Sequence, residues 1–142
     1  PLFFFTLNPA NEIRLSLVGS EMCIRDSPYI KAIRVSPDLN IERAIEHINP
    51  KGGFLFDTWH PKKYGGTGGT FDWDVLPNEL KAPKILAGGL TSTNVGQAIK
   101  IARPDVVDVS GGVESLKGIK DERLIANFVD SVGSADMKIN KK

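Results

Sequence analysis

Apolar residues between positions 29 and 132 follow two alternating periodicities. The run "YIKAIRV", 29–35, is short, apolar and β-branched, which is typical of a strand. After a Ser-Pro-Asp turn, the apolar residues of "LNIERAIEHI", 39–48, recur every three or four positions. This spacing predicts an amphipathic helix. The segment therefore begins with a strand that is followed by a helix.

The same order of strand and helix repeats three more times towards the C-terminus. "GFLFD" precedes a predicted helix at 73–80, "KILAGG" one at 95–102, and "VVDVSGG" one at 124–132. Repeated units of this kind, with strands apolar on both faces, indicate an α/β fold with a parallel sheet covered by helices. Two architectures fit: a doubly wound open sheet, and a TIM barrel of which these units form one half.

Polar residues and glycines at the strand ends distinguish these architectures. Barrel enzymes carry catalytic groups at the C-terminal ends of their strands and bind phosphate with the loops after the last two. Glycine lets backbone amides approach phosphate oxygens without interference from a Cβ. The pattern favours the half-barrel, with a phosphate site made by the residues after the last two strands. These residues are Gly88, Gly89, Ser110, Gly111 and Gly112.

Composition excludes several classes of protein. The 142 residues are 41% hydrophobic and 25% charged with a net charge of +1, which is typical of one soluble domain and does not require nucleic acid or a membrane as partner. "PLFFF" is too short for a signal-peptide core, and no apolar run approaches a membrane span. We therefore expect a cytoplasmic protein. No Cys/His cluster has the spacing of a zinc site, so we expect no metal.

The segment "SLVGSEMCIRDS", 16–27, has neither periodicity. Most of it back-translates as CTC GTG GGC TCG GAG ATG TGT ATA AGA GAC, which resembles the transposon mosaic-end adapter of sequencing libraries read in one open frame. On this interpretation the single cysteine, Cys23, carries no chemistry. The expected organisation is a foreign or adapter-derived, unstructured segment at 1–27, a half-barrel at 28–132 and a tail at 133–142.

Three motifs carry a resemblance to a known family. "FLFDTWHPKKYGGTGGTFDW", "ILAGGLTSTNV" and "VDVSGGVESLKGIKD" resemble, in order and spacing, the last three active-site loops of phosphoribosylanthranilate isomerase. The resemblance covers Pro28 to about Val132 and implies the C-terminal half, strands 5–8, of a (βα)8 TIM barrel. It also implies the Amadori rearrangement of N-(5-phosphoribosyl)anthranilate to 1-(2-carboxyphenylamino)-1-deoxyribulose 5-phosphate in tryptophan biosynthesis. The family needs no cofactor or metal for this reaction.

The resemblance assigns the general acid to Asp57. A carboxyl group directly after an apolar strand has its pKa raised by desolvation, which keeps a proton available. The structural alternative is an aspartate that caps its loop or pairs with Lys62 or Lys63. The family's general base is a cysteine in a "KICG" motif of the first strand, which this sequence lacks, and Cys23 does not match it. We therefore expect the chain by itself to be inactive.

The resemblance also assigns substrate-binding residues. Asp108 matches a position near the amino or hydroxyl groups of the substrate, with a structural hydrogen-bond acceptor as the alternative. Relatives often carry serine where this chain has Gly111. The loop "GGTGGTFDW" matches a mobile lid, with a solvated linker as the alternative. The lid residues are Gly65, Gly66, Thr67, Gly68 and Gly69.

Two other classes of function stay open at this point. Indole-glycerol-phosphate synthase and ribulose-phosphate epimerase are also phosphate-binding barrels, but "FDT", "GGTGGTFDW" and "SGGVE" together argue against both. A non-catalytic half-barrel would bind a small phosphorylated molecule without turnover. Its exposed sheet edges and uncovered apolar face predict self-association, as in a homodimer.

Overall fold

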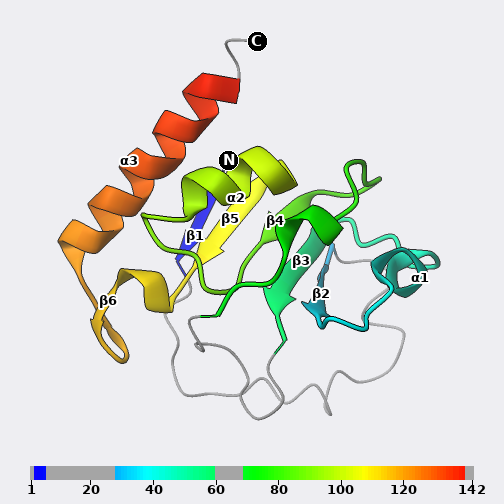
Figure 1. Ribbon diagram of the computed structural model, residues 1–142. Coiled ribbons are helices and arrows are strands. Elements are labelled where there is room, and N and C mark those ends of the chain that lie inside the picture. Colours follow the sequence, from blue (N-terminus) through cyan, green and yellow to red (C-terminus); the bar gives the residue numbers. More distant parts are fainter. Residues whose placement is uncertain (1, 6–27, 60–68, 140–142) are drawn as a thin grey trace.

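The computed structural model describes residues 2–5, 28–59 and 69–139 (Figure 1). Its main sheet has five parallel strands in the order β1-β5-β4-β3-β2. These strands are β1 (Leu2–Phe5), β2 (Ile30–Val35), β3 (Gly53–Thr58), β4 (Lys84–Leu86) and β5 (Val106–Val109). The strands β6 (Glu114–Leu116) and β7 (Ile119–Lys120) form a separate antiparallel pair. The predicted α/β fold with a parallel sheet is confirmed.

Three helices and two 3-10 turns complete the described structure. They are α1 (Ile41–Ile45), η2 (Trp73–Val75), α2 (Val95–Ala102), η3 (Gly111–Val113) and α3 (Glu122–Ile139). The short α1 begins where the side chain of Asn40 accepts a hydrogen bond from the Arg43 amide at 2.9 Å. The predicted helix at 95–102 agrees with α2 at both ends.

The hydrophobic core lies between the helices and one face of the sheet, with the helices on the near side in Figure 1. Alternate residues of neighbouring strands supply the sheet side of this core. Phe56 pairs in register with Leu86, and Leu86 with Val107, and all three side chains are buried. Residues one position away therefore point to the opposite face, because side chains alternate along a strand. Asp57 and Asp108 belong to that opposite face.

The helix predicted at 73–80 is wrong. Only the single turn η2 forms, and Leu76 then adopts an extended conformation with φ −76° and ψ 137°. Leu76 precedes Pro77, and the proline ring disfavours helical angles in the residue before it. The apolar spacing of this segment instead places the buried Leu76 in the core.

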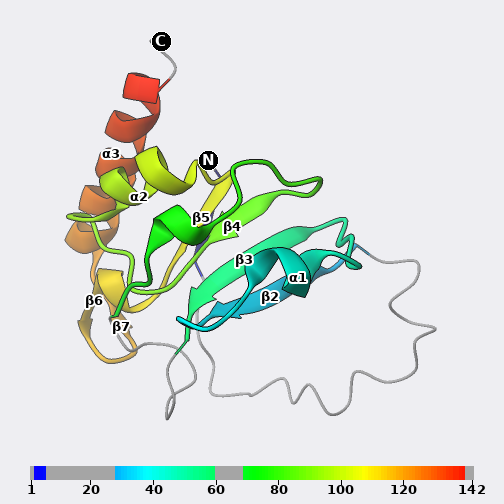
Figure 2. The ribbon, with the colours of Figure 1, turned by 45° about the vertical axis from the view of Figure 1, so that its right-hand side comes forward.

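The expected tail at 133–142 is also wrong over most of its length. Helix α3 runs to Ile139, well past the predicted end at 132. Val132 and Ala135 are buried, and Ala135 lies 4.0 Å from the position that a Cβ on Gly96 of α2 would take. Packing against α2, which Figure 2 shows beside α3, therefore extends the helix.

The N-terminal segment was expected to be unstructured, and for residues 2–5 this is wrong. Leu2–Phe5 forms β1, whose register partners are Val106 to Val109 of β5. Because β5 would otherwise be an edge strand with unpaired backbone groups, a short β-forming run can pair with it. The rest of the segment, including Cys23, lies outside the described residues.

Candidate active site

The register of the sheet brings the two predicted acidic residues onto one row. Leu55 is aligned with Ile85, and Ile85 with Val106. Two residues further along their strands, Asp57 and Asp108 therefore occupy the same row of the same face, at the carboxyl ends of β3 and β5. The parallel sheet thus places two carboxyl groups at one edge, as the sequence predicted.

The loop after β4, the strand between β3 and β5, approaches Asp57 so closely that only glycine fits. Gly88 has a φ of +86°, and a Cβ at this position would lie 2.6 Å from the amide nitrogen of Thr58 and 2.9 Å from Oδ1 of Asp57. The same Oδ1 accepts a hydrogen bond from the Thr58 amide at 2.8 Å. Gly88 therefore packs directly against the Asp57 carboxylate. The amide of the next residue in β3, Thr58, holds the same carboxylate by a hydrogen bond.

Burial raises the pKa of Asp57 above its ordinary value. The hydrogen bond from the Thr58 amide and the positive charge of Arg34, its register partner on β2, oppose this shift without cancelling it. A half-buried carboxyl group of this kind keeps its proton to a higher pH than an exposed one. The direction agrees with the expectation for a general acid.

The side chain of Asp108 is also half-buried. Burial raises its pKa first, the negative charge of Asp57 raises it further, and Lys120 opposes both effects. Its Oδ1 is buried and has no hydrogen-bond partner within the described part of the chain. Because a buried oxygen without a partner is costly, this atom is suited to contact a ligand.

Asp108→Asn is expected to stabilise the protein at neutral pH, raising its melting temperature by a few degrees. The folded-state pKa of Asp108 is raised, so the cost of burying its charge is absent below the unfolded-state pKa and appears as pH rises through the folded-state value. Thermal unfolding at pH 4 and pH 7.5 checks this. The exposed Asp130→Asn on α3 is the control, and an equal gain in both variants would contradict the assignment.

The two glycine loops that the sequence assigned to phosphate lie against each other. A Cβ on Gly112 would overlap the carbonyl oxygen of Leu90, so the loop after β5 packs directly on the loop after β4. Asn94 orders the second loop, because its amide nitrogen donates to the Gly89 carbonyl at 2.9 Å and its oxygen accepts from the Thr91 amide at 2.8 Å. The loops therefore form one unit ahead of helix α2.

Backbone donors of this unit are available to an anion. Within the described part of the chain, the amides of Gly88, Gly89, Gly111 and Gly112 donate no hydrogen bond to another residue. Gly88 and Gly89 have positive φ values, which turn the chain sharply after β4. Such a concave set of amides matches the requirements of a phosphate group.

Lys120, which no sequence pattern singled out, contacts the loop after β5. It lies within the quoted motif "VDVSGGVESLKGIKD", but it follows the glycines by eight or more positions and carries no spacing signal of its own. Its ammonium donates to the backbone oxygen of Ser110 at 2.9 Å, to Ser110 Oγ at 3.2 Å and to Glu114 Oε1 at 2.7 Å. Only the hairpin β6–β7 brings it back to Ser110.

Most of the expected lid cannot be placed. Gly65, Gly66, Thr67 and Gly68 lie outside the described residues, whereas Gly69 is described and exposed. Lys62 and Lys63, the alternative partners of Asp57, also lie outside. The lid assignment therefore stays a prediction.

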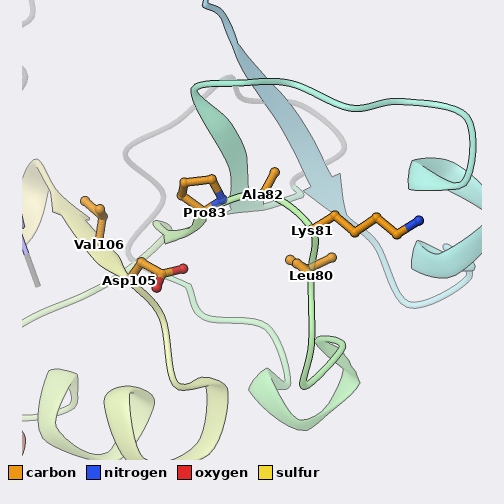
Figure 3. Close-up of a pocket in the computed structure, with 6 residues that line it drawn as sticks. All are labelled: Leu80, Lys81, Ala82, Pro83, Asp105 and Val106. Atoms are coloured by element: carbon orange, nitrogen blue, oxygen red, sulfur yellow. The ribbon is translucent and has the colours of Figure 1, made fainter.

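The cavity in Figure 3 lies at the opposite edge of the sheet. It has a volume of about 440 Å³ and is lined by Leu80, Lys81, Ala82, Pro83, Asp105 and Val106. These residues precede β4 or mark the start of β5, whereas Asp57 and Asp108 lie near the ends of their strands. The carboxylate of Asp105 already accepts a hydrogen bond from the Lys84 amide at 2.7 Å. This cavity is therefore separate from the candidate active site.

Over residues 2–5, 28–59 and 69–139, no group of three or more His, Cys, Asp or Glu side chains is placed to hold a metal ion. Among the described helices, none has both the length and the apolar character needed to span a membrane.

Comparison with known proteins decides the family. The family model described as N-(5'phosphoribosyl)anthranilate (PRA) isomerase matches residues 17–131. The chain belongs to this family. The match begins inside the segment 16–27, whose adapter-derived origin stays a prediction. Of the candidate residues, Asp57, Asp108, Ser110 and all glycines of both loops lie within the matched range.

Individual relatives agree with the family assignment. The N-(5'-phosphoribosyl)anthranilate isomerase of Neisseria meningitidis serogroup C is 49% identical over 104 residues, which are 73% of this chain and 50% of the relative. The phosphoribosylanthranilate isomerase structure from Thermotoga maritima has a TM-score of 0.60 and 41% identity, covering 74% of this chain and 51% of that one. A phosphoribosyl anthranilate isomerase structure in complex with reduced 1-(o-carboxyphenylamino)-1-deoxyribulose 5-phosphate has a TM-score of 0.52 and 33% identity. It covers 74% of this chain and 48% of that one. The chain thus spans about half the length of the curated relatives that it matches.

Proposed function

We propose that this chain is the C-terminal half, strands 5–8, of the (βα)8 barrel of a phosphoribosylanthranilate isomerase. In this assignment β2, β3, β4 and β5 are barrel strands five to eight. The single observation that supports it most strongly is the placement of Asp57 against Gly88, with both glycine loops at the same edge of the sheet. Half coverage of each relative agrees with a half-barrel.

The complete protein would isomerise N-(5-phosphoribosyl)anthranilate. Asp57 would protonate the ring oxygen, which breaks the bond from C1 to that oxygen and leaves a protonated Schiff base between C1 and the anthranilate nitrogen. A general base would then remove the proton from C2, giving an enol amine. Tautomerisation of the enol yields the 1-deoxyribulose ketone, so atoms and charge balance without a cofactor.

Each part of the site would have a separate role. The amides of Gly88, Gly89, Gly111 and Gly112, with Ser110, would bind the 5-phosphate and hold the sugar in place. The unpartnered Oδ1 of Asp108 would accept a hydrogen bond from an amino or hydroxyl group of the substrate. The general base would belong to the half-barrel that this sequence lacks.

The test uses a joined protein. Residues 28–142 would be fused behind the N-terminal half of the Neisseria meningitidis relative, and the consumption of N-(5-phosphoribosyl)anthranilate would be followed. We expect turnover by the joined protein and none by the chain alone. Turnover by the chain alone, or a folded joined protein that binds the reduced product without turnover, would contradict the proposal.

A non-catalytic, self-associating half-barrel is the second candidate, and the exposed edge strand β2 favours it. Ile30 is 50% exposed, and the neighbouring Ala32 and Arg34 of the same strand are exposed as well. In the described part of the chain β2 has a neighbouring strand on one side only, and an edge of this kind can pair with a second copy of the chain. Light scattering during size-exclusion chromatography distinguishes the homodimer from the monomer.

A further inference from the structure

Lys120 connects the short hairpin to the candidate phosphate loop. Its ammonium makes three hydrogen bonds, two to Ser110 and one to Glu114, with lengths from 2.7 to 3.2 Å. The side chains of Lys120 and Glu114 are only 18% and 17% exposed. Two partners on the same serine restrict both the backbone and the hydroxyl group of Ser110, which a single surface ion pair would not do.

The loop held in this way has few other anchors. Ser110 has φ −124° and ψ −80°, outside the regular helix and strand regions, and no cap hydrogen bond from its own side chain to η3. On the far side of the loop, Gly112 packs against the Leu90 carbonyl. Lys120 and Leu90 therefore hold the loop from two sides, and within the described residues the amides of Gly111 and Gly112 have no acceptor.

The charge of Lys120 also lies beside the site. The positive charge of its ammonium opposes the rise in the pKa of Asp108 on β5. The carboxylate of Glu114, which accepts a hydrogen bond from the same ammonium, compensates part of this charge. A cation fixed next to free backbone amides strengthens their attraction for an anion. Lys117, on the same hairpin, makes no hydrogen bond to Ser110 and has an exposed side chain.

We propose that Lys120 is a positioning residue for the phosphate subsite. It holds Ser110 so that the amides of Gly111 and Gly112 face the ligand, and its charge strengthens phosphate binding. This inference rests on the proposed function, in which the loop after β5 binds the substrate's phosphate.

The test measures binding of ribose 5-phosphate to the chain itself, by calorimetry and by the amide NMR signals of Gly111 and Gly112. Lys120→Met is expected to weaken binding about tenfold or more, because both hydrogen bonds to Ser110, the one to Glu114 and a charge are lost. The matched control Lys117→Met removes the same charge from the same hairpin and is expected to change the affinity less than about twofold.

Glu114→Gln separates positioning from simple stabilisation. The glutamine oxygen still accepts from Lys120, but the compensating negative charge is gone, so binding is expected to be tighter. If Lys120 only held the hairpin together, Lys120→Met and Glu114→Gln would both lower the melting temperature and leave the affinity unchanged, which would overturn the inference. Should Lys120→Met fail to fold, Glu114→Gln decides, since unchanged or weaker binding by this variant overturns the inference equally.

The outcomes also separate this inference from the proposed function. If the unaltered chain shows no binding of ribose 5-phosphate, the phosphate site itself is wrong, and the role of Lys120 falls with it. If the unaltered chain binds and Lys120→Met binds equally well, the phosphate site stands and only the role of Lys120 is wrong.

Discussion

Asp57→Asn is expected to lower kcat of the joined protein by about 10²- to 10⁴-fold, the usual contribution of a general acid. Asparagine keeps an oxygen that can accept the hydrogen bond from the Thr58 amide, so the loop geometry is retained while the transferable proton is lost. Substrate consumption at saturating concentration measures the effect. Because the phosphate contacts stay intact, KM should change much less than kcat.

The pH profile provides a second readout for Asp57. Burial raises the pKa of this group, and a general acid must be protonated to act. Activity that depends on it is therefore present below its raised pKa and falls as pH rises through that value. Asp57→Asn should remove this limb, while the exposed Asp130→Asn should leave both rate and profile unchanged. An unchanged kcat in Asp57→Asn would contradict the assignment.

Gly88→Ala is expected to have the largest effect on folding, lowering the free energy of unfolding by about 2 to 5 kcal/mol. The φ of +86° is costly for any residue with a Cβ, and the added methyl group would press on the Thr58 amide and on Oδ1 of Asp57. The Thr58 amide belongs to the backbone of β3, so it cannot move aside as the end of a flexible side chain could. Urea unfolding of the chain measures the loss.

Gly111→Ala is the matched control for Gly88→Ala. It places the same methyl group in the neighbouring loop, where a Cβ would meet no atom within 4 Å and no positive φ is involved. Its effect on stability should lie within about 0.5 kcal/mol. Equal losses in both variants would show that the close approach at Gly88 is not the cause.

The order of strands and helices was predictable from residues 28–132 because local patterns encode it. Buried parallel strands appear in the sequence as apolar runs. Helix α2 appears as an amphipathic repeat, and its predicted ends agree with the observed ones. The site residues after the strands were predictable for the same reason. Where parallel strands end, their last side chains meet at one edge, so Asp57, Asp108 and the two glycine loops had to be neighbours.

One local effect and two long-range contacts account for the differences between the predicted and the observed elements. Pro77 limits the helix predicted at 73–80 to a single turn. This effect is local, but the prediction followed the apolar spacing of the segment instead. Packing on α2 extended α3 to Ile139, and an open edge on β5 paired with Leu2–Phe5.

The sequence by itself determined the α/β class, the strand-end carboxylates and glycines, and the family motifs, because each depends on neighbours within a few residues. Only the tertiary structure decided that Gly88 abuts Asp57, that Gly112 packs on Leu90, and that Lys120 turns back onto Ser110. These contacts join segments ten or more residues apart. Their distances depend on strand register and on a hairpin, which single-residue patterns do not encode.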